Sequence, residues 1–345
     1  MKKIVVMPVK NEDWILEKTL SAISLWADHI IIADNNSTDE TIEICKKYSK
    51  VNVIKNEAVY HNSNVRKELL DAARNFDGYN FIMSLDADEI PTTHILNGNF
   101  WDKISSLKPG DSINLQWVML WRSIYNYRDD NSVWSNNWKV FGFLDNRKFE
   151  FDTLNVINDH TSRVPSSALT YINKFETPKI LHFQFANWDR MLSKHRHYRV
   201  VELIQRGNYA KTIYDINRLY YDSKNESELQ LVNTPEEWFQ LYIDNGIDLN
   251  QINLSDAIHW YDIEVINHFQ NYGLKKFKWL DIWDVDWEAI RKLTKSNNIK
   301  PKKKFIDPRN FIIKKYHKNQ LYFVKKRRRL EKILFYLSKV QKKYR

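Results

Sequence analysis

The first ninety residues alternate between short apolar runs and stretches with helical spacing. The apolar runs have strand length and cover residues 3–7, 29–33, 51–54 and 81–85. The stretches between them have apolar positions at helical spacing and cover residues 14–26, 37–48 and 64–75. Strands joined in sequence by helices form parallel sheets with right-handed crossovers. The sequence therefore predicts an α/β fold, with a mostly parallel sheet flanked by helices.

The pattern changes after Pro91. Residues 113–121 alternate between apolar and polar side chains, which predicts a long strand at an antiparallel junction. Further strands are expected at residues 140–144 and 180–185. From Asn187 onward the patterns predict helices, at residues 189–205, 235–244, 255–271 and 286–296. The second part of the chain is thus expected to be mostly helical.

These patterns predict three regions. They are a domain at residues 1–206, made of two halves at 1–91 and 92–206, a helical extension at 207–299 and a tail at 300–345. The net charge of +10 is concentrated in the tail, because residues 311–345 contain 13 Lys or Arg and one acid. The remainder is slightly acidic, which argues against a nucleic-acid groove across the main domain.

A cluster of carboxylates follows the fourth apolar run. Asp86 and Asp88 are two residues apart at the point where the predicted strand ends. Ligands of open α/β sheets bind outside the carboxyl ends of the strands. Two carboxylates with this spacing can bind one hard divalent cation, Mn²⁺ or Mg²⁺. Taken alone, an Asp-x-Asp sequence is more often a solvated acidic turn than a metal site.

Three more polar features occupy equivalent positions along the chain. Pro-Val-Lys-Asn-Glu at residues 8–12 follows the first predicted strand, residues 34–39 follow the second, and Arg66 opens the third helix. Ser37 and Glu40 have the spacing of a capping box, with Ser37 as the N-cap. All four features would lie along one edge of a parallel sheet, where they suit a nucleoside diphosphate held with a metal.

The order and spacing of Pro-Val-x-Asn-Glu, Asp-x-x-Ser-x-Asp-x-Thr and Asp-x-Asp over residues 3–91 resembles the family 2 glycosyltransferases, which have the GT-A fold. The resemblance implies a nucleotide-sugar site whose residues include Pro8, Val9, Glu12, Asp34, Arg66 and Asp86. In it, Asp34 would bind the base, usually uracil, and Arg66 would face the diphosphate. The metal, Mn²⁺ or Mg²⁺, would be held by Asp86 and Asp88. Asn35 and Asn36 replace the Asp-Gly often found in the family, and Asn tolerates the positive φ of such a turn.

An inverting sugar transfer needs a general base for the acceptor hydroxyl. The resemblance implies an Asp or Glu downstream of the metal motif, and the candidates are Asp159, Glu150 and Asp152. We favour Asp159, because it follows an apolar run like the polar tip of a strand. His182 lies in an apolar run, where it is either a core residue or the late histidine that completes the metal shell in many GT-A enzymes.

The predicted function is therefore metal-dependent transfer of a sugar, with inversion, from a UDP-sugar to a glycan or lipid-linked saccharide. A nucleotidyltransferase is an alternative, although it would favour a Gly-rich basic loop after the first strand, where Asn11 and Glu12 stand. A non-enzymatic nucleic-acid-binding protein would use the basic tail. It would also need a basic body, which this sequence lacks.

The tail has the pattern of a basic amphipathic helix. Its apolar positions share one helical face and are Leu330, Ile333, Leu334, Leu337 and Val340. Such a helix either docks on an anionic membrane surface or packs its apolar face on protein. The single cysteine, Cys45, excludes a disulfide framework, and no apolar run approaches the length of a membrane span. We expect a cytoplasmic protein whose tail docks on the inner face of the membrane.

Overall fold

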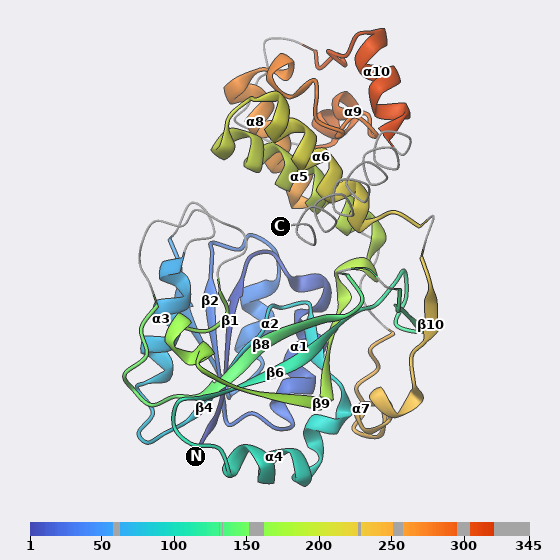
Figure 1. Ribbon diagram of the computed structural model, residues 1–345. Helices are drawn as coiled ribbons and strands as arrows, with labels where there is room; N and C mark the ends of the chain where they lie inside the picture. Colours follow the sequence, from blue (N-terminus) through green and yellow to red (C-terminus); the bar gives the residue numbers. More distant parts are fainter. Residues whose placement is uncertain are drawn as a thin grey trace, which may run out of the picture. The chain divides into compact units, whose positions relative to one another are not determined.

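The computed structural model describes residues 1–57, 63–130, 132, 134–151, 162–226, 229–250, 258–294 and 304–320. The chain forms two compact units, each described separately below (Figure 1). Unit 1 contains Met1–Trp188 and Glu228–Asp256, and unit 2 contains Asp189–Ser227 and Ala257–Arg345.

Unit 1 is built on a sheet of eight strands in the described residues, in the order β3-β2-β1-β4-β8-β6-β9-β5. The strands are β1 Lys3–Val9, β2 His29–Asp34, β3 Val51–Lys55, β4 Phe81–Ser84, β5 Glu89–Pro91, β6 Asp111–Met119, β8 Asn137–Leu144 and β9 Tyr171–His182. The pairs among β1, β2, β3 and β4 are parallel, as is the pair of β6 with β9. The pairs of β4 with β8, β8 with β6 and β9 with β5 are antiparallel. The predicted α/β class, with a mostly parallel sheet and an antiparallel junction, is confirmed.

Both faces of β1, β2 and β4 are buried, which explains their nearly continuous apolar sequence, whereas the edge strand β3 is largely exposed. On one face, Val5 and Met7 pack with apolar residues of α1 Asp13–Ser24, α2 Thr41–Lys46 and α4 Gly98–Ser105. On the other face, Ile4 and Val6 pack with α3 Ser63–Ala73. Alternate side chains of one strand therefore belong to two separate cores, and the strand ends are fixed at one edge of the sheet.

Unit 1 also contains smaller elements, which lie within residues 120–188 and 229–250. Strands β7 Asn126–Arg128 and β10 Leu231–Asn233 form an antiparallel pair. Helix α7 Gln240–Asp244 lies against the main sheet region through Tyr242, whose hydroxyl donates to the Pro91 carbonyl at 2.8 Å. In the described residues of both units, the 3₁₀ helices are Thr93–Leu96, Ser166–Leu169, Phe183–Phe185, Glu236–Trp238 and Leu274–Phe277.

Unit 2 is helical in its described residues. Its helices are α6 Ala210–Ser223, α8 Trp260–Tyr272, α9 Trp287–Leu293, α10 Phe311–Lys318 and all of α5 Trp188–Arg206 after its first residue. Apolar residues of α5, α6, α8 and α9 form one core, which includes Val200 and Leu203 of α5, Ile216 of α6 and Val265 of α8. Because α5 packs into this core, the division falls at Trp188 and not at the expected residue 206, and residues 228–256 return to unit 1.

The predicted capping box is wrong. Helix α2 begins at Thr41 after Glu40, and Glu40 makes no side-chain cap bond. The hydroxyl of Ser37 instead accepts from the backbone N–H of Asn11 at 2.9 Å, and the Thr41 N–H is bound by Asp39 at 3.0 Å. Ser37 therefore joins two loops at the sheet edge, and this contact replaces the expected cap.

The predicted basic amphipathic helix lies outside the described residues, because the structure describes the tail only from 304 to 320. No helix in the described part of the chain is both long and apolar enough to span a membrane.

Candidate active site

The loops that follow β1, β2 and β4 share one edge of the sheet. Val9 at the end of β1 pairs with Asp34 at the end of β2, and β4 runs parallel on the other side of β1. Parallel neighbours place their carboxyl ends together, so the loops that follow these three strands start from the same edge. The predicted common edge is confirmed.

The first two of these loops are bound to each other. The Thr38 backbone N–H donates to the side chain of Asn11 at 2.7 Å, and the Glu12 N–H donates to Thr41 at 2.8 Å. Asn11 and Asn36 both have φ 53°, a region that Asn tolerates better than most residues. The predicted positive φ in the Asn35–Asn36 turn is thus found at Asn36.

The predicted nucleotide-binding residues line these loops. Val9 and Asp34 are buried, with 4% and 8% exposure, while Pro8 is half-buried at the end of β1. The Asp34 carboxylate accepts the Ser37 N–H at 3.2 Å and 3.3 Å, so it also orders its own loop. The Glu12 carboxylate accepts the indole N–H of Trp14 at 2.7 Å. The structure brings these residues together, and their contact with a nucleotide stays a prediction.

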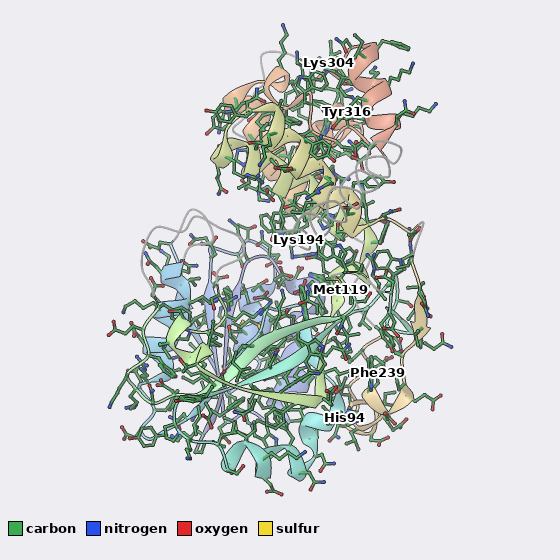
Figure 2. The ribbon with its side chains drawn as sticks, viewed as in Figure 1. His94, Met119, Lys194, Phe239, Lys304 and Tyr316 are labelled. Atoms are coloured by element: carbon green, nitrogen blue, oxygen red, sulfur yellow. The ribbon has the colours of Figure 1, made fainter. Side chains whose placement is uncertain are left out.

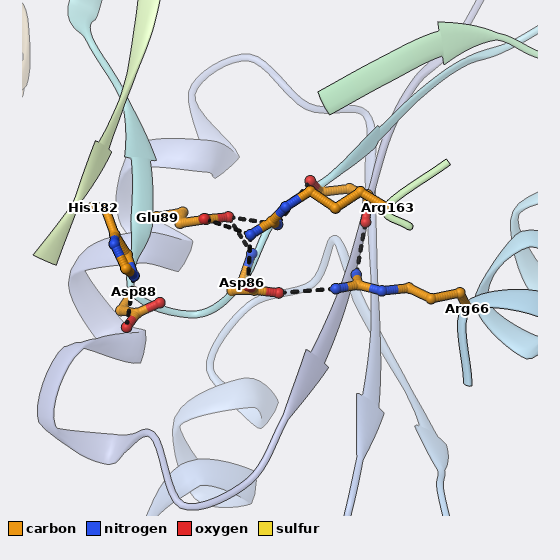
Figure 3. A network of polar contacts seen from close by, with 7 residues as sticks. Arg66, Asp86, Asp88, Glu89, Arg163 and His182 are labelled. Atoms are coloured by element: carbon orange, nitrogen blue, oxygen red, sulfur yellow. Dashed lines mark hydrogen bonds and ion pairs between the residues drawn. The ribbon is translucent and has the colours of Figure 1, made fainter. Parts of the chain in front are cut away.

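Asp86 lies between two arginines (Figure 3). Its Oδ1 is 3.1 Å from Arg66 and its Oδ2 is 2.7 Å from Arg163. Arg66 also donates to the Ser84 hydroxyl at 2.7 Å. Arg163 is joined by two further bonds, each 2.7 Å, to the two oxygens of Glu89. One network of charge-assisted hydrogen bonds at the end of β4 therefore joins the two arginines, the two carboxylates and the Ser84 hydroxyl.

Glu89 is the fully buried member of this network. Its side chain has 0% exposure, and burial raises its pKa, while the Arg163 guanidinium opposes the rise. One of its oxygens also accepts the backbone N–H of Asp86 at 2.8 Å. Glu89 therefore holds both Arg163 and the backbone of the Asp86–Asp88 turn in place.

Asp88 faces His182 instead. His182 ends β9 and pairs in register with Glu89 on β5, so it stands beside the turn. Its Nε2 lies 3.5 Å from an Asp88 oxygen, and both side chains are buried. The other ring nitrogen, Nδ1, is buried without a hydrogen-bond partner. The ring stacks on Trp117, with centroids 4.3 Å apart, which fixes its plane.

The donor atoms suit a divalent cation in part. One carboxylate and one imidazole are ligands that Mn²⁺ accepts. Within the described residues, no group of three or more His, Cys, Asp or Glu could hold a metal by itself. Asp88 and His182 therefore fit a cation that completes its shell with substrate oxygens. The metal role expected for Asp86 stays a prediction, and the structure gives its carboxylate two arginine partners.

Lys139 on β8 lies close to this network. Its Nζ is 3.6 Å from the ring centroid of Trp117. Burial, the largest cause, and the nearby Arg163 together lower the pKa of Lys139 to about 8, although Glu89 and Asp86 act to raise it. No hydrogen bond or ion pair to a described residue holds its ammonium group. A half-buried cation of this kind can bind an anionic group of a substrate.

The three base candidates differ in what the structure shows. Asp159 and Asp152 lie outside the described residues. Glu150 is exposed and lies within electrostatic range of Lys67 on α3 and of Arg74, which follows this helix. None of the three is brought to the Asp88 side chain by a described contact, and the choice of base stays a prediction.

Two charged residues at the site were not predicted, Arg163 and Lys139. Arg163 contacts Asp86 and Glu89 across 77 and 74 positions of sequence, so no local pattern indicates it. Lys139 lies in the alternating part of β8, where a polar residue is ordinary. Glu89 belongs to the acidic cluster that the sequence shows, but only its burial separates its role from that of Asp86.

The first part of the chain matches the model of one protein family. Residues 4–104 match the model of glycosyl transferase family 2. This segment is therefore a family 2 glycosyltransferase domain, and the prediction of a glycosyltransferase enzyme is confirmed at that level. No curated protein matches the chain.

Solved structures with some likeness include glycosyltransferases and related synthases. Residues 1–349 of S. aureus TarS are 14% identical, with 84% of this chain and 83% of that chain covered and a TM-score of 0.38. The same TarS fragment with UDP-GlcNAc is 14% identical, with 81% of each chain covered and a TM-score of 0.38. Glucosyl-3-phosphoglycerate synthase from Mycobacterium tuberculosis, with Mn²⁺, UDP and glucosyl-3-phosphoglycerate, is 22% identical. The match covers 34% of this chain and 44% of that chain, with a TM-score of 0.27. At these TM-scores the likenesses carry no argument about this chain.

Proposed function

We propose, on the premise that residues 4–104 are a family 2 glycosyltransferase domain, that the protein transfers a sugar from a UDP-sugar to a glycan or lipid-linked saccharide with inversion. The observation that carries the proposal is the buried pair of Asp88 and His182, 3.5 Å apart at the edge that carries the family motifs. The preference for UDP comes from the family resemblance. A divalent cation bound by this pair would act as a Lewis acid on the leaving diphosphate.

The other residues are proposed to position the reactants. Pro8, Val9, Glu12 and Asp34 would bind the nucleoside, as the resemblance implies. The Arg163–Glu89 pair would keep the Asp86–Asp88 turn rigid, since its bonds fix both the side chain and the backbone of Asp86. A general base would take the proton of the acceptor hydroxyl. The hydroxyl oxygen would attack the anomeric carbon while the bond from that carbon to the diphosphate breaks.

The test is release of nucleotide from a panel of donors. Purified protein is incubated with UDP-, GDP- and CDP-sugars and, in separate reactions, with nucleoside triphosphates and a sugar phosphate. Each reaction is run with Mn²⁺, with Mg²⁺ and with chelator. We expect UDP to be released from one UDP-sugar only when a divalent cation is present. A nucleotidyltransferase would instead release pyrophosphate from a nucleoside triphosphate and a sugar phosphate. Pyrophosphate release without any release of UDP would support that alternative.

Replacing the base is expected to separate binding from turnover. We predict that Asp159→Asn keeps its affinity for the UDP-sugar and loses ~10²–10⁴ in kcat, the usual contribution of a general base. Asp152→Asn and Glu150→Gln serve as matched comparisons, because all three remove one carboxylate charge. If one of those two shows the pattern, the base is that residue. If all three variants keep normal kcat, the inverting mechanism through these candidates is wrong.

The pH dependence is expected to report Lys139. Its folded-state pKa is about 8, so it is a cation below that pH and loses its charge above it. The charged groups facing it are Arg163, Glu89 and Asp86. If its ammonium binds an anionic substrate group, kcat/KM for the donor falls as pH rises through about 8. Lys139→Arg should abolish that fall, because arginine stays protonated. Lys139→Gln should lower kcat/KM about 10- to 100-fold below pH 8, the value of one charged hydrogen bond. An unchanged profile in Lys139→Arg would contradict the assignment.

A further inference from the structure

Helix α10 of unit 2 exposes two adjacent large apolar side chains. Phe311 and Ile312 are 78% and 68% exposed, whereas the next residue, Ile313, is 1% exposed. In the preceding segment Ile306 is also 66% exposed. Burying one such side chain contributes about 1.5–3 kcal/mol, so leaving two neighbours in water forgoes several kcal/mol. Exposed apolar groups that gather in this way often mark interaction sites.

The exposure is not caused by a loose helix. Asn310 caps α10 by accepting the Ile313 N–H at 3.0 Å. The ring of His317 contacts the Trp279 carbonyl at 3.0 Å, and Arg309 donates to the Trp283 carbonyl at 3.2 Å. The helix is thus anchored on unit 2 by one face and presents the other face outward.

The outward face is strongly basic. Residues 304–320 contain five Lys or Arg, namely Lys304, Arg309, Lys314, Lys315 and Lys318 (Figure 2 labels Lys304, and Tyr316 on α10). The only acid in this segment is Asp307, and it is already paired with Arg309 at 3.0 Å and Lys314 at 3.5 Å. This segment therefore carries an excess of positive charge, which includes Lys315 and Lys318 on the same helix as the exposed apolar pair.

These properties select among possible occupants. Residues 325–329 of the tail are Lys-Lys-Arg-Arg-Arg, so the chain's own tail would bring like charge onto this face. A second copy of α10 would do the same. An anionic lipid surface supplies negative headgroups for the lysines and an acyl boundary for the apolar side chains.

We propose that α10 docks unit 2 on an anionic membrane, with Phe311 and Ile312 inserted among the headgroups and Lys314, Lys315 and Lys318 bound to lipid phosphates. This inference goes beyond the proposed function, since it concerns where the enzyme works and stands whether or not the donor is a UDP-sugar. It does not depend on the structure of residues 321–345.

The test is co-sedimentation of the full chain with phosphatidylcholine vesicles that contain or lack phosphatidylglycerol. We expect the wild type to bind only the anionic vesicles and more weakly at high salt. Lys315→Gln with Lys318→Gln should weaken binding roughly 30-fold, because each basic residue near the surface contributes ~1 kcal/mol. Phe311→Ser with Ile312→Ser should weaken it at least about tenfold and remove the part that survives high salt.

Leu293→Ser is the matched control, because Leu293 is 66% exposed in the same unit but lies on α9. It should bind as the wild type does. Equal binding of the Phe311/Ile312 double variant and the wild type would overturn the proposal, and so would failure of the wild type to bind anionic vesicles. If the wild type forms an oligomer without lipid and the Phe311/Ile312 double variant does not, this face contacts a second copy of the chain instead.

Discussion

Asp88→Asn is expected to lower the rate of sugar transfer by roughly 10³-fold while leaving the fold intact. A Lewis acid contributes several kcal/mol to stabilising a leaving group, and the amide that replaces the Asp88 carboxylate is a poor ligand for a hard cation. Asp88→Ala should reduce activity equally. His182→Ala should do so less completely, because a carboxylate ligand then remains. The measurement is kcat with saturating Mn²⁺, using nucleotide release as the readout.

Folding is checked on the same samples by circular dichroism and by Tm. Asn matches the shape of Asp, and the Asp88 backbone carbonyl still accepts the Phe183 N–H at 2.9 Å. Glu43→Gln is the matched control, because Glu43 forms only an exposed pair with Lys46. Near-normal turnover of Asp88→Asn in Mn²⁺ would show that Asp88 does not hold the metal.

Arg163→Ala is expected to be the most destabilising single change at the site. It leaves the Glu89 carboxylate buried without its cation, and breaking a buried pair in this way costs about 3–5 kcal/mol. The expected drop in the Tm of unit 1 is on the order of 10 °C. Lys67→Ala is the control, since its pair with Asp71 is exposed and such pairs contribute about 0–1 kcal/mol.

The stability lost in Arg163→Ala should depend on pH in a defined direction. Burial already raises the pKa of Glu89, and removing Arg163 removes the cation that opposes this rise. A carboxyl whose folded-state pKa is raised is least costly when protonated, so the deficit of Arg163→Ala should shrink as pH falls and grow as pH rises. Adding Glu89→Leu to Arg163→Met should recover most of the stability, because an apolar pair removes the buried charge. A double variant as unstable as Arg163→Ala would contradict this account.

The parallel half of the sheet could be predicted because its sequence signal is local. Residues such as Val5 and Ile31 lie in short runs buried on both faces, and the intervening helices have clear spacing. Helices α4 and α6 were not predicted. Helix α4 has eight residues and begins at Gly98, and α6 contains two partly buried tyrosines, Tyr214 and Tyr221, beside the buried Tyr220. Strand β9 extends well before its predicted start, because its first half is largely exposed and lacks an apolar run.

The site was predictable where motifs mark it. Asp86, Asp88 and Asp34 were placed correctly at the sheet edge, since strand ends follow from the strands themselves. Which partner each carboxylate has could not be predicted. Arg163 and His182 reach the Asp86–Asp88 turn from segments far along the chain. The position of His182 beside this turn depends on the register of β5 with β9.

The most direct measurement of the central claim is the thermal shift of the full chain with UDP, with and without Mn²⁺, in the wild type and in Asp88→Asn. A ligand that binds only the folded state stabilises it by about 2.7 kcal/mol at a hundred times its Kd. The account predicts that UDP with Mn²⁺ raises the Tm of the wild type well beyond UDP or Mn²⁺ alone, and that Asp88→Asn loses this synergy. An equal rise in both proteins, or no rise in the wild type, would contradict a metal-bound nucleotide at Asp88 and His182.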